Sequence, residues 1–247
     1  MKQIVLSFIV LGLLAAHAGG QQPAADAALK VHLMGVGGGY KPDVSLRDFK
    51  KYLEERYRVE CTASLGNNTK KLDNLEPLKS ADVLVAFTHR LNLPDEQMAI
   101  IRDHWEKGKP IVALRTASHG FQQADNEIFD KKVLGGDYKG YGSGPFKAIA
   151  AKDQAEHAIL KGVEPITSKG YYNNGKLAET AVVLQVVESD KKTPQPVTWA
   201  HTYKGGRIIY TSMGVPEDFQ DENFRRLLTN AIFWTTQRDP NKLKLAK

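Results

Sequence analysis

The chain has 247 residues, a formal net charge of +6 and one cysteine, Cys61. Its lysines and arginines are scattered or lie next to acidic residues, so a nucleic-acid partner is not expected. A single cysteine excludes an internal disulfide, and its apolar surroundings favour a buried, unreactive thiol. Length and composition fit one large α/β domain with an ample core.

Residues 1–18 have the pattern of a secretory signal peptide. A lone Lys2 precedes an apolar run from Ile4 to Ala16, and we expect cleavage after Ala18. The run is shorter than the roughly 20 apolar residues of a spanning helix, so no membrane insertion is expected after cleavage. The protein is then exported, to the periplasm or outside the cell. The expected segments are a signal peptide at 1–18, a flexible leader at 19–28, the folded domain at 29–238 and a basic tail at 239–247.

The first half of the chain alternates apolar runs with amphipathic ones. Continuous or period-2 apolar segments predict strands, and a period of 3.6 predicts helices. Repeated strand-helix units predict a flavodoxin-like, mostly parallel sheet with helices on both faces. The expected strands are Leu29–Val36, Arg58–Ala63, Ala81–Thr88 and Pro110–Arg115, and the expected helices are Ser45–Tyr57 and Pro94–Lys107.

After Phe121 the pattern changes to short strands and turns. Pro196–Tyr203 and Arg207–Met213 flank two glycines and predict a β-hairpin. Asp221 then opens an amphipathic helix, Phe224–Thr235, whose apolar residues should pack on the sheet. The second half is therefore expected to be rich in hairpins. Its other predicted strands are Phe146–Ala151 and Ala181–Val187.

Polar side chains follow two of the predicted parallel strands. His89 and Arg90 come after one strand, and Arg115, Ser118 and His119 come at the end of the next. Ligands of open α/β sheets bind beyond the carboxyl ends of the strands, so we predict a polar cleft there for a hydroxylated or anionic ligand. His119, His89 and Arg115 are its candidate catalytic residues, with Arg90 and Ser118 binding the ligand. The alternative is structural: Arg90 pairs with an acid and His89 caps a helix.

Ser118 beside His119 does not by itself predict a serine nucleophile. Neighbours in sequence usually point apart, and the chain has no G-x-S-x-G elbow. His157 and His201 lack metal-ligand spacing. No cofactor or metal site is therefore predicted, and a divalent metal held by histidines from distant segments stays an open alternative.

Two glycine-rich segments could shape the cleft. Gly37 and Gly38 follow the first strand and would let the backbone approach a ligand, although the spacing is not that of a dinucleotide fingerprint. Tyr138, Tyr141 and Tyr171 lie among glycines and suit stacking on sugar rings. The alternative for these tyrosines is a mobile loop with packed rings.

An ordered set of motifs resembles the ThuA-like (trehalose utilisation) family. The motifs are IVALRTASHGF, VLGGDYKGYGSGPF, EHAILKGV, PVTWAHTYKGGRIIYTSMGVPEDF and FRRLLTNAIFW, and the resemblance runs from about Leu29 to Trp234. It implies a flavodoxin-like fold related to class I glutamine amidotransferases. It also implies a role in sugar catabolism on a disaccharide or keto-sugar derivative, with a sugar oxidoreductase in the same pathway.

The chain departs from these relatives at functional positions. Amidotransferases place a nucleophilic cysteine and a histidine where Arg115 and Val215 stand here, which argues against that chemistry. The ThuA-like pattern usually has histidines at the places of Tyr141 and Val215. Two hypotheses stay open: an exported enzyme of sugar catabolism, or a carbohydrate-binding or accessory protein with a degenerate active site. The sequence indicates no oligomeric state.

Overall fold

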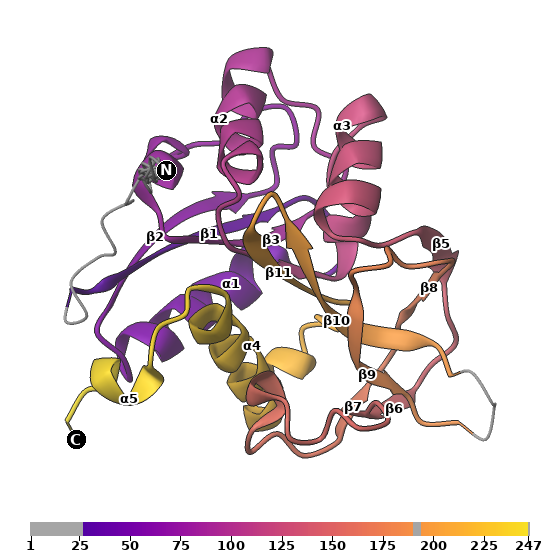
Figure 1. Ribbon diagram of the computed structural model, residues 1–247. Coiled ribbons are helices and arrows are strands. Elements are labelled where there is room, and N and C mark those ends of the chain that lie inside the picture. The colour runs from indigo at the N-terminus through magenta and orange to yellow at the C-terminus, as the bar shows by residue number, and fades with distance from the viewer. Residues whose placement is uncertain (1–26, 190–193, 247) are drawn as a thin grey trace, which may run out of the picture.

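A computed structural model describes residues 27–189 and 194–246, so the expected signal peptide lies outside the described residues (Figure 1). Its centre is a nine-stranded sheet of order β2-β1-β3-β4-β11-β10-β9-β6-β7. The strands from β2 to β11 in this order run parallel, and the others are antiparallel. The bounds are β1 Leu29–Val36, β2 Val59–Gly66, β3 Val83–Thr88, β4 Ile111–Leu114, β6 Phe146–Ala150, β7 Ile166–Ser168, β9 Val182–Val187, β10 Pro196–Tyr203 and β11 Gly206–Thr211.

Helices cover both faces of the sheet, which confirms the flavodoxin-like prediction (Figure 1). On β3, Val83 and Val85 belong to one core and Leu84 to the other, as the period of 2 requires. The first core also contains residues of α1 and α4, and the second contains residues of α2 and of the helical segment Ile128–Val133. The bounds are α1 Pro42–Glu54, α2 Asp95–Glu106, α4 Glu222–Thr235 and α5 Pro240–Leu243.

The predicted hairpin is present, and its second strand completes the parallel half of the sheet. Tyr203 pairs with Gly206 across the turn, and β11 then runs parallel to β4. The helix after it begins at Glu222, because the Asp221 side chain accepts a hydrogen bond from the backbone N–H of Asn223. Helix α1 begins earlier than expected, at Pro42, since proline is favoured in a first helical turn.

One helical segment and one small sheet were not predicted. Gln123–Glu127 forms α3, and the chain continues as a π-helix, Ile128–Val133, where short strands and turns were expected. Its apolar face is short and lies among charged residues, so its helical periodicity is weak. The small sheet pairs β5, Tyr138–Tyr141, with β8, Tyr172–Asn174. Four short 3₁₀ turns complete the described elements: Glu76–Ser80, Arg115–His119, Ala158–Leu160 and Asp218–Gln220.

The segment expected to be a basic tail contains packed residues. Leu243 of α5 is 1% exposed, and its carbonyl accepts a hydrogen bond from the backbone N–H of Arg58 at 2.6 Å. The described chain therefore stays in contact with its core as far as α5. None of the helices in residues 27–189 and 194–246 is long and apolar enough to cross a membrane.

Candidate functional site

A cavity of about 330 Å³ opens beyond the carboxyl end of β4. We call it the Arg115 cleft. Segments far apart in the sequence line it: the loop before α1, the turn after β4, the end of β5, and the segments before β8 and after β11. Its position matches the ligand-binding edge of open α/β sheets. The lining residues used below are Tyr40, Arg115, Tyr141, Lys169, Gly170, Tyr171, Val215 and Glu217.

Arg115 forms the base of this cleft. It follows β4 with a φ of 44°, in the left-handed region, and is 3% exposed. Nη1 donates hydrogen bonds to the carbonyls of Gly170 at 2.8 Å and Ser212 at 2.9 Å. The guanidinium carbon lies 4.0 Å from the ring centroid of Tyr40 and 4.8 Å from that of Tyr172. Arg115 is thus a buried cation in contact with two aromatic rings.

Tyr40 is a site residue that the sequence analysis missed, and Tyr172, expected with Tyr171 to be an exposed tyrosine, is instead buried next to the cleft. Burial would raise the pKa of Tyr40, but its hydrogen bond to Arg115 and the charge of that guanidinium lower the pKa overall. Tyr172 is fully buried, and burial raises its pKa. Its ring contacts Tyr141 at 5.4 Å between centroids. The signal for Tyr40 was its place directly after the glycines that follow β1.

His119 and Ser118 are in contact, so the expectation that they point apart is wrong. A 3₁₀ turn, Arg115–His119, curls the chain so that Ser118 Oγ lies 3.1 Å from His119 Nδ1. The Ser118 hydroxyl also lies 3.2 Å from the carbonyl of Arg115, which can only accept, so the serine oxygen is shared between this carbonyl and the imidazole. Ser118 is 0% exposed, which argues against a nucleophilic role.

The two candidate histidines meet edge to face, with 5.1 Å between ring centroids. His119 also stacks on Tyr138 at 4.3 Å and contacts Tyr172 at 5.3 Å. Burial, followed by the nearby charges of His89, Arg90 and Arg115, lowers the pKa of His119 to about 3. Burial and the charge of Arg90 also lower the pKa of His89. Both rings are therefore neutral at pH 7. Tyr172 connects the two parts of the site, because its ring contacts both His119 and Arg115.

Gly37 and Gly38 differ in the space that a side chain would have at each position. A Cβ on Gly37, whose φ is +105°, would lie 2.8 Å from the carbonyl oxygen of His89. A Cβ on Gly38 would meet nothing within 4 Å. Gly37 thus allows the first loop to approach His89, and neither glycine lines the Arg115 cleft.

Arg90 is exposed and has a φ of 52°. Its backbone N–H donates to the carbonyl of His119 at 3.0 Å, which ties the two candidate turns together. Within residues 27–189 and 194–246, no ion pair to Arg90 is found, and no helix is capped by the side chain of His89. The structural alternative for these two residues is therefore not what the described chain shows.

The three candidate tyrosines occupy different positions. Tyr141 is 66% exposed at the mouth of the cleft, and Tyr171 lines its wall and contacts Phe146 at 5.0 Å between centroids. Tyr138 instead lies against His119 and borders a separate cavity of about 350 Å³, which Ser118 also lines. Tyr141 pairs with Tyr172 in the small sheet, and the rings of Tyr138 and Tyr172 pack against each other at 5.0 Å between centroids, as the structural alternative expected of packed rings.

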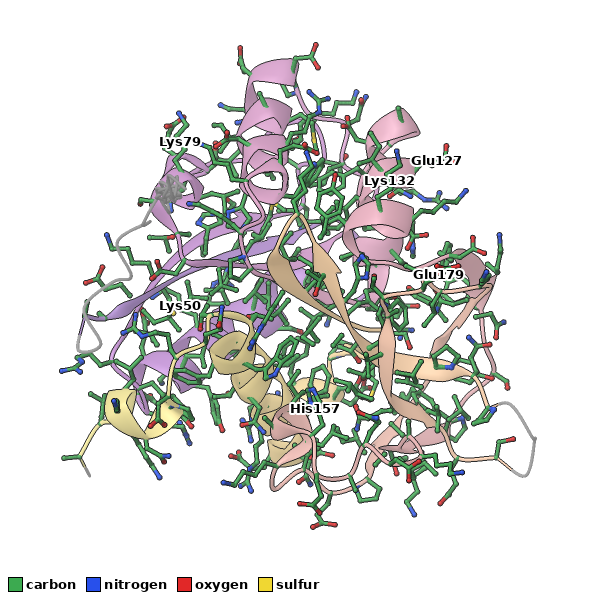
Figure 2. All side chains as sticks on the ribbon, viewed as in Figure 1. Lys50, Lys79, Glu127, Lys132, His157 and Glu179 are labelled. Atoms are coloured by element: carbon green, nitrogen blue, oxygen red, sulfur yellow. The ribbon has the colours of Figure 1, made fainter. Side chains whose placement is uncertain are left out.

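Two further histidines, His157 and His201, and the cysteine lie outside the Arg115 cleft. His157, labelled in Figure 2, contacts Trp234 of α4 at 5.4 Å between ring centroids. His201 hydrogen-bonds Thr180 and the carbonyl of Lys132. Over the part of the chain that the structure describes, no group of three His, Cys, Asp or Glu side chains could hold a metal ion. Burial raises the pKa of Cys61 to about 12, so its thiol is protonated at neutral pH.

The chain is similar in sequence and structure to a family of known proteins. The profile of the family described as ThuA, trehalose utilisation, matches residues 16–235. A ThuA-like protein from Bacteroides uniformis has a TM-score of 0.65 at 19% identity, with 90% of this chain and 98% of that chain covered. A second, from Parabacteroides merdae, has a TM-score of 0.63 at 14% identity, with 89% and 93% covered.

A cytoplasmic protein from Salmonella typhimurium LT2 shares the fold with a TM-score of 0.60 and 14% identity, covering 84% of this chain and 99% of its own. At such identities the likeness concerns the fold alone. A search of curated protein sequences finds no match for this chain.

Proposed function

The chain belongs to the ThuA family of trehalose utilisation proteins, and from that premise we propose that the Arg115 cleft binds a carbohydrate in sugar catabolism. The observation that carries this proposal is the arrangement of Tyr40, Tyr141 and Tyr171 around one buried guanidinium. Exposed aromatic faces suit the apolar faces of a sugar ring, while tyrosine hydroxyls and Arg115 offer polar partners for its oxygens. A mono- or disaccharide, or its keto derivative, is the ligand class that this combination favours.

Binding is favoured over histidine catalysis by the position of His119. Its ring contacts Tyr138 and Tyr172, and it is not among the residues that line the cleft. A general base has to come within hydrogen-bond reach of the proton that it removes. We therefore place His119 behind the cleft, as a residue that supports Tyr172.

An enzyme acting on a keto-sugar is the second candidate, and Tyr40 is the observation that favours it. Tyr40 lines the cleft, and the Arg115 guanidinium lowers its pKa against the effect of burial. A tyrosine of this kind could move a proton next to a ketone while Arg115 stabilises the developing negative charge. Such a keto-sugar would come from a sugar oxidoreductase. Turnover of a keto-disaccharide that is lost in Tyr40→Phe, with binding kept, would support this candidate.

Export is proposed on the pattern of residues 1–18 alone. The test is cell fractionation followed by N-terminal sequencing of the protein. A chain beginning at Gly19, recovered outside the cytoplasm, is the expected result. A chain that keeps Met1 and stays in the cytoplasm would contradict it.

The binding proposal is tested by titration calorimetry and thermal shift with trehalose, glucose and their keto derivatives. A ligand at 100 times its Kd stabilises the native state by about 2.7 kcal/mol. We expect Tyr141→Ala to lose at least tenfold in affinity without loss of stability, because this side chain is largely exposed. Tyr203→Ala, in the hairpin away from the cleft, is the control for affinity. Absence of binding by every sugar tested would overturn the proposal.

A further inference from the structure

The charge of Arg115 is the feature of the cleft that a neutral sugar does not explain. The side chain is almost fully buried, and within residues 27–189 and 194–246 no carboxylate forms an ion pair with it. Its Nε is buried and has no hydrogen-bond partner there. A buried charge is costly unless a counter-charge and hydrogen bonds compensate it. The cleft therefore has an electrostatic requirement that an anion would meet.

Two acidic residues of the loop after β11, Glu217 and Asp218, already have partners. Asp218 Oδ2 accepts hydrogen bonds from the backbone N–H groups of Gly214 at 2.7 Å and Val215 at 3.0 Å, and from Ser168 Oγ at 2.9 Å. Burial raises the pKa of Asp218, although the charge of Arg115 acts in the opposite direction. Its carboxylate thus compensates the guanidinium from a distance and does not contact it.

Glu217 lies at the rim and forms an ion pair with Lys169, where both side chains are more than half exposed. Exposed ion pairs contribute little, so this pair does little to compensate the charge of Arg115, which no carboxylate of the described residues contacts. The rim and the base together present two cations, Lys169 and Arg115, against one carboxylate that lines the cavity.

The Nη2 end of the Arg115 guanidinium lies close to Gly170, which lines the cleft. Nη1 is used by two backbone carbonyls, whereas a Cβ on Gly170 would lie 3.6 Å from Nη2. Gly170 lines the cavity and carries no side chain, so a ligand oxygen can approach where that Cβ would stand. Arginine binds carboxylates with charge-assisted hydrogen bonds, which are stronger than neutral ones.

We propose that the carbohydrate of this cleft is a sugar acid, whose carboxylate binds Arg115 while its ring lies against Tyr141. This inference rests on the proposed carbohydrate function and adds the charge of the ligand to it. A carboxylate fits better than a phosphate, because one buried guanidinium compensates a single charge and Glu217 at the rim opposes a dianion. Uronates and aldonates are the corresponding classes.

The test compares glucuronate with glucuronamide, which has nearly the same shape and no charge, by titration calorimetry on the full chain. We expect glucuronate to bind at least tenfold more tightly, and Arg115→Met to abolish that difference. Because Arg115→Met could disturb folding, Glu217→Gln provides a second measurement at an exposed position. It should raise the affinity for glucuronate by about two- to fivefold and leave that for glucuronamide unchanged. Glu188→Gln, which breaks the exposed pair with Lys147, is the matched control.

The outcomes separate this inference from the function beneath it. Equal binding of glucuronate and glucuronamide, or tighter binding of neutral sugars, would overturn the sugar acid and keep the carbohydrate site. Tighter binding of glucose 6-phosphate than of glucuronate would overturn the choice of a carboxylate. No binding by any acidic or neutral sugar would overturn both proposals.

Discussion

Ser118 Oγ lies 3.1 Å from Nδ1 of His119, although the two residues are neighbours in the chain. The contact depends on the 3₁₀ turn after β4, which the carbonyl of Arg115 stabilises by accepting hydrogen bonds from Ser118 and Tyr210. One short turn therefore fixes the positions of both the Arg115 guanidinium and the His119 imidazole.

Stability should fall on acidification because His119 is neutral in the folded chain. Its pKa falls from an ordinary 6.5 to about 3 through burial, so the unfolded chain binds more protons at pH 5 and stability decreases as pH falls below 6.5. This group alone should cost about 2 kcal/mol between pH 7.5 and 5.

Urea unfolding at the two pH values measures this effect. His119→Gln should flatten the dependence by that amount, since glutamine does not titrate. His157→Gln is the control, because His157 is only half-buried. Equal pH dependence in wild type and His119→Gln would show that other histidines, such as His32 with a pKa lowered to about 4 by burial, carry the effect.

Gly37→Ala should destabilise the protein by more than about 1 kcal/mol, because the native φ is positive and the new Cβ would clash with the carbonyl of His89. Gly38→Ala, one residue on, should change stability by less than about 0.5 kcal/mol. Paired chemical denaturation of the two variants measures the difference. Similar losses in both would mean that the loop shifts to accept either side chain.

The sequence predicts the parallel half of the sheet and the residues that gather at the carboxyl ends of its strands. Period-2 patterns such as that of β3 fix which side chains face each core, and parallel order brings His89 and Arg115 to one edge. Spacing along the chain does not reveal that Tyr172 contacts Arg115 and His119, because this contact needs the small β5-β8 sheet. Nor does it reveal the π-helical segment, whose apolar face is short.

Cys61 should resist thiol reagents in the native state. Burial raises its pKa to about 12, so at pH 8 the reactive thiolate is far rarer than for a free cysteine of pKa about 8.5. With Ellman's reagent we expect the reaction to follow unfolding in urea and to be slow without it. Cys61 is half-buried rather than fully buried, so the prediction rests on its protonated state, and rapid stoichiometric labelling of the native protein would contradict it.

Asp218→Ala should be the most destabilising change in the loop that borders the cleft. It removes the acceptor of two backbone N–H groups and one hydroxyl, all buried, and each unpartnered group costs about 1–3 kcal/mol. Asp218→Asn keeps one carbonyl oxygen for these donors, so we expect roughly 1 kcal/mol of loss against at least about 3 for alanine.

The comparison of the two Asp218 variants separates hydrogen bonding from charge. Burial raises the pKa of Asp218, which means that its environment opposes the negative charge and tolerates a neutral isostere. Asp221→Asn, which preserves an N-cap, should change stability by only a few tenths of a kcal/mol and serves as the control in urea unfolding. Equal losses in Asp218→Asn and Asp218→Ala would show instead that the carboxylate charge, acting on the buried Arg115 cation, holds this loop in place.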